Sequence, residues 1–190
     1  MLEFLPPGGT VRKLWIGEAE AYRDHLLRLD FESRRRRFSG GVGDDFIAQH
    51  ARSIGAFGVV VYGFFLDGVL RGAAELRPAG PFAREAEAAF SIEQPWQSLG
   101  VGSVLLERIL LAARNRGITA LQMQCLAENR RMQQLARKFE ADLKFDFGDV
   151  VAEVDPPRFT GLSLLREWTE DGWGVVNALL DAQVRLVRAD

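Results

Sequence analysis

The stretch that most constrains the fold runs from Ala88 to Ala113, because it changes from one periodicity to another within a few residues. Its first part, AAFSI (Ala88–Ile92), is an apolar run typical of a buried strand. Its last part, VLLERILLAA, repeats apolar residues at helical spacing. Between them, Gly100 and Gly102 allow a positive φ or a close approach to the main chain. The sequence therefore predicts a strand, a glycine turn and a helix whose first N–H groups suit an anion.

The segments on both sides of this unit predict a mixed sheet. An Asp67-Gly68 pair between two apolar runs is a strong hairpin signal. The strand–helix–strand unit over Glu85–Ala127 predicts a right-handed crossover between parallel strands. The predicted fold class is α/β or α+β, a mixed and mostly antiparallel twisted sheet flanked by helices. We expect strands at residues 10–16, 57–66, 69–78, 85–92 and 118–127 with two more within 143–155, and helices at 18–29, 31–38, 44–54, 101–115 and 129–139.

A proline pair divides the chain. Pro156-Pro157 follows the last predicted strand, so residues 1–155 are expected to form one domain. Residues 156–190 carry apolar side chains such as Leu164, Leu165 and Trp168 at helical spacing, which predicts an amphipathic helical C-terminal extension. Such a helix can pack on its own domain or pair with a second subunit, so a homodimer through the extension is possible.

Charge and composition narrow the function classes. A formal net charge of -2 at pH 7 argues against a nucleic-acid partner. The densest basic tract, Arg34–Arg37, is predicted to be a solvated helix face. A single cysteine, Cys125, excludes an internal disulfide and a multi-cysteine zinc site, and we expect no metal. The sequence shows neither a signal-peptide pattern nor an apolar run long enough to span a bilayer. We therefore expect a cytoplasmic protein with no membrane partner.

Two common phosphate-binding motifs fit the glycine turn poorly. A P-loop requires a lysine and then Ser or Thr after its last glycine, whereas Gly102 is followed by Ser103 and Val104. A dinucleotide-binding loop requires a third glycine, and position 105 is leucine.

A third motif fits well. Gln97-x-x-Gly100-x-Gly102, entered from a strand and opening a helix, resembles the pyrophosphate loop of the GNAT acyltransferase superfamily. The resemblance covers Thr10–Glu153, and its specific portion is Glu87–Phe139. The segments SRRRRF and LAENRRM are similar to the bacterial protein-lysine acetyltransferase type. Two positions depart from the family pattern: Ser98 replaces a common glycine, and Glu140-Ala141 replaces a glycine-aromatic pair.

The resemblance implies acetyl-CoA as co-substrate. Main-chain N–H groups of residues 99–103 would surround the pyrophosphate, and the strand end at residues 90–92 would pair with the pantetheine arm. Asn129 would bond that arm, cap the following helix, or do both. The implied cofactor-binding residues are Phe90, Ser91, Ile92, Gln97, Ser98, Leu99, Gly100, Val101, Gly102, Ser103 and Asn129.

The general base is predicted from strand parity together with the resemblance. Glu87, Ser91 and Glu93 share one strand face. Glu87 occupies the position of the catalytic glutamate in the lysine acetyltransferase branch, with Glu93 and Glu75 as reserves. The alternative is that Glu87 is an exposed charge at the strand end.

Other polar residues carry weaker signals. Many family members place a tyrosine on the helix that is predicted here to start at Asn129. Its position, after Leu135, is Ala136, and neither Tyr22 nor Tyr62 is near it in sequence. His25 and His50 have no acidic or cysteine partner at ligand spacing, so we expect no special role for either.

The functional prediction is an acyl-CoA-dependent N-acyltransferase that transfers an acetyl group to a primary amine, of a protein lysine or a small molecule. The alternative is a CoA-binding regulatory or interaction module with little or no turnover.

Overall fold

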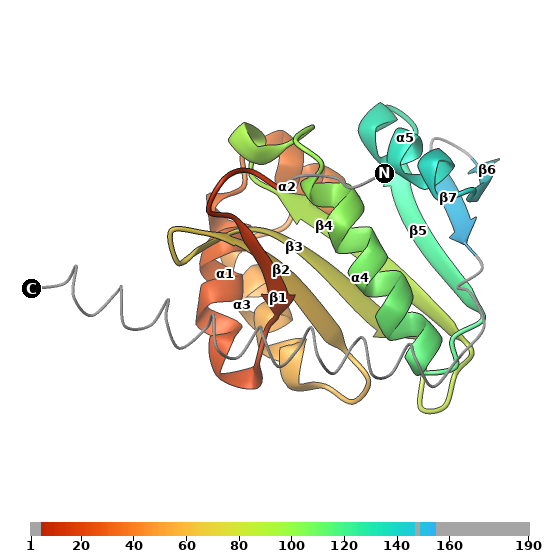
Figure 1. Cartoon of the computed structure of the whole chain (residues 1–190), viewed down its shortest axis with the longest axis horizontal. Coiled ribbons are helices and arrows are strands. Elements are labelled where there is room, and N and C mark those ends of the chain that lie inside the picture. The colour runs from red at the N-terminus through yellow and green to blue at the C-terminus, as the bar shows by residue number, and fades with distance from the viewer. Residues whose placement is uncertain (1–4, 147–148, 155–190) are drawn as a thin grey trace, which may run out of the picture.

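The computed structural model describes residues 5–146 and 149–154, which form one seven-stranded sheet flanked by helices (Figure 1). The strand order is β1-β2-β3-β4-β5-β7-β6. The strands are β1 (Thr10–Lys13), β2 (Val60–Leu66), β3 (Val69–Pro78), β4 (Glu85–Ile92), β5 (Ala120–Leu126), β6 (Asp142–Asp146) and β7 (Asp149–Val154), and the helices are α1 (Ala19–Arg28), α2 (Phe31–Phe38), α3 (Asp44–Arg52), α4 (Val101–Asn115) and α5 (Arg130–Lys138).

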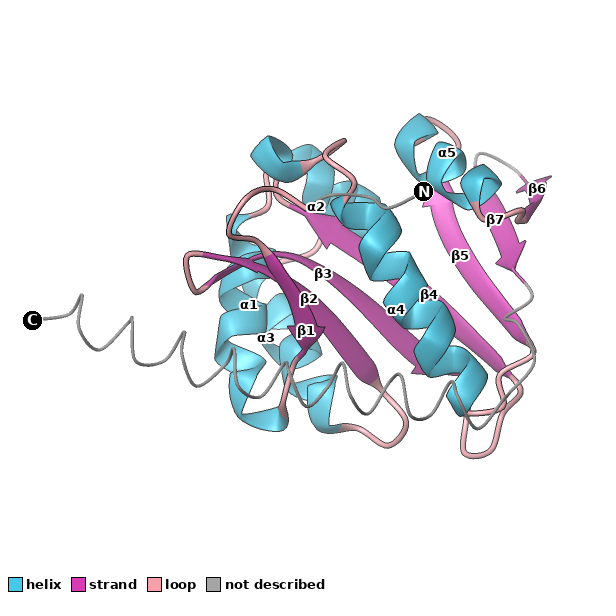
Figure 2. Cartoon of the chain, in the orientation of Figure 1, coloured by secondary structure: helices cyan, strands magenta, loops and turns pink. Residues whose placement is uncertain are grey.

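The pairing of the strands confirms the predicted mixed sheet. β4 and β5 are parallel, while all other neighbouring strands in the described part are antiparallel. The parallel register joins Glu85–Glu87 to Ala120–Gln122. Beyond Glu87 the two strands diverge, as Figure 2 shows. The sheet therefore opens in its middle, directly beside the glycine turn that follows β4.

The two faces of the sheet are covered by different helices. α4 crosses one face, and α1 and α3 lie on the other (Figure 1). The first core joins buried side chains of α4 to Leu76, Leu121 and Met123. The second joins α1 and α3 to the opposite side chains of β2, including Val61 and Phe65.

The position of α4 follows from its sequence. Gly100 is the N-cap, with a φ of 83° that disfavours any residue with a side chain. Leu105, Leu106 and Ile109 recur on one face and are fully buried against the sheet. The predicted bounds of this helix, residues 101–115, are confirmed.

One predicted strand ends earlier than expected, and one predicted segment lies outside the described residues. β1 ends at Lys13 and not at Ile16, because a 3-10 turn over Ile16–Glu18 brings Glu18 back to Arg12 in a two-bond ion pair. The predicted C-terminal extension, residues 156–190, and the dimer contact assigned to it lie outside the described residues. In the part of the chain that the structure describes, every helix is too short or too polar to cross a membrane.

Candidate active site

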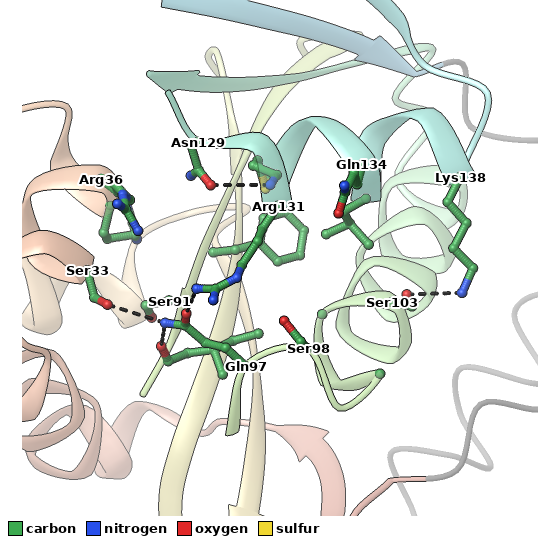
Figure 3. A pocket seen from close by; sticks show the side chains of 17 residues that line it. Ser33, Arg36, Ser91, Gln97, Ser98, Ser103, Asn129, Arg131, Gln134 and Lys138 are labelled. Carbon is green, nitrogen blue, oxygen red and sulfur yellow. Dashed lines mark hydrogen bonds between the residues drawn. The ribbon is translucent and has the colours of Figure 1, made fainter. Parts of the chain in front are cut away.

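A cavity of about 420 Å³ occupies the opening between β4 and β5 (Figure 3). Nine of the eleven residues assigned to cofactor binding line it: Phe90, Ser91, Ile92, Gln97, Ser98, Gly100, Gly102, Ser103 and Asn129. The side chains of the other two do not. Leu99 is 46% exposed, and Val101 is buried in the core beneath α4.

The glycine turn forms one wall of the cavity. α4 begins at this wall, and its N-cap makes no side-chain hydrogen bond to the first turn. A Cβ built on Gly102 would lie 3.5 Å from the Leu135 side chain and 3.6 Å from that of Ile92. The first N–H groups of a helix are hydrogen-bond donors at the positive end of its dipole. This wall of the cavity is therefore suited to a negatively charged group.

Gln97 connects the walls of the cavity. Its amide nitrogen donates to the Ile92 carbonyl oxygen at 2.7 Å and to Ser33 Oγ at 3.3 Å. Its amide oxygen accepts from Arg131 of α5 (Figure 3). One side chain thus joins the end of β4 to α2 on one face of the sheet and to α5 on the other.

The charge around the cavity is one-sided. Two cations come from α2, Arg36 and Arg37, and two come from α5, Arg131 and Lys138. The described residues that line the cavity include no aspartate or glutamate. The arrangement favours an anionic ligand.

The prediction of a solvated face for Arg34–Arg37 was wrong for Arg37. Its side chain is 7% exposed and donates to Glu75 at 2.7 Å. Arg34, by contrast, pairs with the exposed Asp44. The reason is that α2 lies over β4, so one side of this basic helix faces the cavity and the protein interior.

Asn129 caps α5 as predicted, and its predicted bond to the pantetheine arm stays a prediction. Its side-chain oxygen accepts from the Met132 main-chain N–H at 3.3 Å, which caps α5. The residue also lines the cavity. Capping occupies the oxygen of the amide, so the amide nitrogen is the group left to act as a donor.

Glu87 is exposed on β4 at the last position paired with β5. Its register neighbours are Arg77 on β3 and Gln122 on β5. Its side chain is on the same face as Ser91, the face covered by α1 and α2. The strands part at this point, so Glu87 lies where the opening begins, but it does not line the cavity.

Glu75, one of the two alternative candidates for the general base, belongs to a buried network of hydrogen bonds and ion pairs. It accepts from Tyr22 at 3.0 Å, Arg37 at 2.7 Å, His50 at 2.8 Å and also Arg77. Burial alone would raise the pKa of Glu75, but the hydrogen bond from His50 and the surrounding cations lower it to about 2. A carboxylate that binds protons this weakly is a poor general base.

Glu93, the other reserve, is similarly engaged. Arg28 donates to it at 2.9 Å and Arg71 at 3.0 Å, and His25 Nδ1 lies 3.3 Å from it. Burial opposes ionisation, yet the hydrogen bonds from these three residues lower the pKa of Glu93 to about 2. His25 and His50 are thus partners of buried carboxylates, although neither has an acidic residue at ligand spacing in the sequence.

Neither described tyrosine lines the cavity. Tyr22 is buried beside Glu75, and this burial, followed by the Glu75 charge, raises its pKa. Tyr62 belongs to the core on the α4 face. Ala136, at the position where many family members have a tyrosine, is fully buried.

Main-chain groups at the end of β4 point into the opening. The N–H of Glu93 donates to the Arg71 carbonyl at 3.0 Å, so the main-chain groups of Glu93 and Ser91 face β3. Alternate residues of a strand direct their main-chain groups to opposite sides. Phe90 and Ile92 therefore direct theirs toward β5, which has already diverged.

Within residues 5–146 and 149–154, no cluster of three or more His, Cys, Asp or Glu side chains could hold a metal ion.

Comparisons with solved structures show the fold. The chain is similar to the GNAT domain of PAT from S. lividans, with a TM-score of 0.68 and 24% identity over 77% of this chain and 90% of that one. It is also similar to yncA, a putative acetyltransferase from Salmonella typhimurium solved with acetyl-CoA, with a TM-score of 0.60 and 17% identity over 81% and 97%. A cAMP-binding acyltransferase from Mycobacterium smegmatis matches with a TM-score of 0.58 and 20% identity over 88% of this chain and 51% of that one.

Comparison with family models shows the relationship directly. A search of proteins with curated functions finds no significant sequence match. The model of the acetyltransferase (GNAT) family matches residues 23–140, more than half of the chain. The match spans the cavity, from α1 to the end of α5. The chain therefore belongs to the GNAT acetyltransferase family and is an N-acetyltransferase.

Proposed function

We propose that the protein transfers an acetyl group from acetyl-CoA to a primary amine, either a protein lysine or a small amine. The observation that carries this proposal is the cavity between β4 and β5, which combines a helix N-terminus with four cations and no lining carboxylate. Acetyl-CoA is an elongated anion with phosphates toward one end and a thioester at the other. The size and charge of the cavity suit such a ligand.

The phosphate end is assigned to the glycine turn. Main-chain N–H groups of residues 99–102 would donate to the pyrophosphate, with the dipole of α4 behind them, while the N–H of Ser103 donates to the Gly100 carbonyl at 3.0 Å. Arg131 and Lys138 lie on the α5 wall and would neutralise further negative charge. Leu99 and Val101 contribute through the main chain only, which is consistent with the outward and inward directions of their side chains.

The pantetheine arm is assigned to the end of β4. The N–H and C=O groups of Phe90 and the N–H of Ile92 point into the opening, where an extended amide chain could pair with them, while the Ile92 carbonyl already accepts from Gln97. Asn129 would add a side-chain donor from the β5 side. The acetyl-CoA complex of yncA, which has the same fold, supports a cofactor of this kind.

The chemistry requires a base and an oxyanion donor. A lysine amine has a pKa of about 10.4, so it must lose a proton before its nitrogen can attack the thioester. Glu87 would accept that proton, directly or through water. A main-chain N–H from residues 90–92 would stabilise the oxyanion. The C–N bond then forms, the C–S bond breaks, and the thiolate leaves; its pKa of about 8.5 allows departure without an acid.

Binding is tested by calorimetric titration with acetyl-CoA. Gly102→Glu introduces a carboxylate into the cavity wall at a helical position, without the strain expected at Gly100. We expect this variant to bind about 100-fold more weakly, because the added carboxylate would lie beside the bound phosphates and like charges repel. Gly80→Glu is the matched control, since a Cβ there meets open space on a distant loop. Equal binding by both variants would contradict the assignment of the cavity.

Turnover is tested with lysine peptides and small primary amines. Glu87→Gln should lower kcat by about 10²–10⁴-fold and leave acetyl-CoA affinity unchanged. Glu85→Gln, an exposed glutamate on the same face of β4, should retain activity. Tight acetyl-CoA binding without acetylation of any amine, and with no effect of Glu87→Gln, would instead indicate a CoA-binding regulatory module.

A further inference from the structure

Three buried polar side chains form a chain at the edge of the cavity. Ser91 Oγ lies 2.9 Å from His25 Nε2, and His25 Nδ1 lies 3.3 Å from Glu93 Oε1. His25 comes from α1, while Ser91 and Glu93 come from β4 and the residue after it. All three are buried, and Ser91 also lines the cavity (Figure 3).

The partners of Glu93 determine the direction of each hydrogen bond. Arg28 and Arg71 both donate to Glu93, which keeps it an ionised acceptor. Its neighbour His25 must therefore carry its proton on Nδ1 and donate it. Burial lowers the pKa of His25, so the ring is neutral and Nε2 has only a lone pair. The Ser91 hydroxyl therefore donates to Nε2 and presents its own oxygen lone pairs to the surroundings.

This order of groups is the one that activates a serine. An ionised carboxylate orients an imidazole, and the imidazole takes the proton from a hydroxyl as that oxygen attacks a carbonyl carbon. The residue after Ser91 is Ile92, whose main-chain N–H points into the opening between the strands. An N–H directly after the nucleophile is a common oxyanion donor in serine hydrolases. Nucleophile, base and oxyanion donor thus meet at the end of β4, which is assigned to the pantetheine arm and its thioester.

We infer that Ser91 is a second acyl acceptor, which takes the acetyl group from acetyl-CoA and passes it to water when no amine is present. The inference rests on the proposed binding of acetyl-CoA in the cavity. Ser91 Oγ attacks the thioester carbon, and its proton moves to His25 Nε2. The C–S bond breaks, and CoA leaves as the thiol after taking that proton. Water then attacks the ester with His25 as base, which releases acetate and restores the hydroxyl.

The experiment omits the amine. The full-length protein is incubated with acetyl-CoA, and the concentration of free CoA thiol is followed with time. The mass of the protein in acidified samples is measured by intact-protein mass spectrometry. We expect continuous thiol release and a protein fraction heavier by one acetyl group, which peptide mapping places on Ser91. Ser91→Ala should lose the adduct and slow the release by about 10²-fold or more. Ser53→Ala, which removes a serine outside the cavity, should keep both.

Two further measurements separate the possible failures. Calorimetry shows whether Ser91→Ala still binds acetyl-CoA and is therefore folded at the site. Ser91→Cys keeps a nucleophile next to His25 and should accumulate the adduct as a thioester. If wild type binds acetyl-CoA but forms no adduct and releases thiol no faster than Ser91→Ala, the inference is wrong and the proposed function stands. If wild type does not bind acetyl-CoA, both are wrong.

Discussion

The two faces of the sheet are buried by different means. On the α4 face, the large buried side chains of the core are uncharged and mostly aliphatic, as in Leu105, Leu106 and Ile109. On the α1 and α3 face, apolar packing surrounds buried charges, with Glu75 and Glu93 each held by several cations or histidines. Within the described residues, every charged side chain that is fully buried lies on this second face. The stability contributed by the α4 face thus depends on close packing of apolar side chains. The stability contributed by the other face depends on each buried charge keeping its hydrogen-bond and ion-pair partners.

The largest effect is expected where a buried charge loses its partner. Glu75→Ala leaves Arg37 and His50 facing a cavity without a counter-charge, which should lower the free energy of unfolding by about 3–5 kcal/mol. Urea denaturation at neutral pH measures the change. Glu85→Ala, on the exposed end of β4, should change stability by less than about 0.5 kcal/mol. A Glu75→Ala protein as stable as this control would show that the charge network is dispensable.

The apolar face should respond to lost volume. Leu106→Ala removes a fully buried side chain under α4 and should cost about 3 kcal/mol, since the sheet and helix cannot collapse into the space. Leu106→Met keeps the volume and should cost less than about 1.5 kcal/mol. The same denaturation experiment distinguishes them. Equal losses from the two substitutions would mean that this face is not packed tightly.

Acid should reduce the contribution of the buried charged groups to the free energy of unfolding, and leave the contribution of the apolar core under α4 unchanged. Burial lowers the pKa of His25 in the folded state, so stability is lost as pH falls below its usual value of 6.5, where the unfolded chain gains a proton first. The pKa values of Glu75 and Glu93 are also lowered, from 4.5 to about 2, so their contribution is present above about pH 4.5 and lost toward pH 2.

Each of these groups can contribute a slope of up to about 1.4 kcal/mol per pH unit. Denaturation curves at several values between about pH 7 and pH 2 measure the loss, that of His25 first and those of Glu75 and Glu93 below about pH 4.5. Leu106→Ala provides the comparison, because it should lower the curve by a constant amount at every pH. A curve for wild type that stays flat below pH 6 would contradict the assigned role of His25.

The smallest effect concerns two backbone positions outside both cores. Ser98 and Glu140 have positive φ values of 61° and 59°, although neither is glycine. Both stand where the family commonly has glycine. Ser98→Gly and Glu140→Gly should each stabilise the protein by about 0.5–1 kcal/mol, because strain is relieved. Glu107→Gly, in the middle of α4, should instead destabilise by about 1 kcal/mol. Thermal denaturation is sensitive enough to show the opposite signs.

The elements were predictable because their signals are local. β3 and β4 begin and end as predicted, since the Asp67-Gly68 turn fixes the hairpin and the proline-containing loop after β3 separates the two strands. α4 begins as predicted because a glycine cap marks its start. The cavity wall around Gly100 and Gly102 was predictable for the same reason.

The contacts between elements were not predictable. His25 and Glu93 are 68 residues apart, and His50 and Glu75 are 25 apart, so no spacing rule relates them. Periodicity assigns a side chain to a face of its own helix, but it does not reveal what lies opposite. This limit explains the wrong expectation for Arg37 and why the carboxylate partners of the two histidines could not be predicted. One signal was present: Glu75 interrupts the apolar run of β3, and a charge in such a run requires partners.

The short pairing of β4 with β5 affects the amide protons at the end of β4. Glu85–Glu87 pair with β5, whereas the main-chain groups of Phe90 and Ile92 face the opening. These two amides lie in the middle of a protected sheet and should nevertheless exchange with solvent deuterium as quickly as those of a loop. An extended ligand lying in the opening would protect them. The exchange rates of the Phe90 and Ile92 amides can therefore show when an extended ligand occupies the opening and pairs with β4.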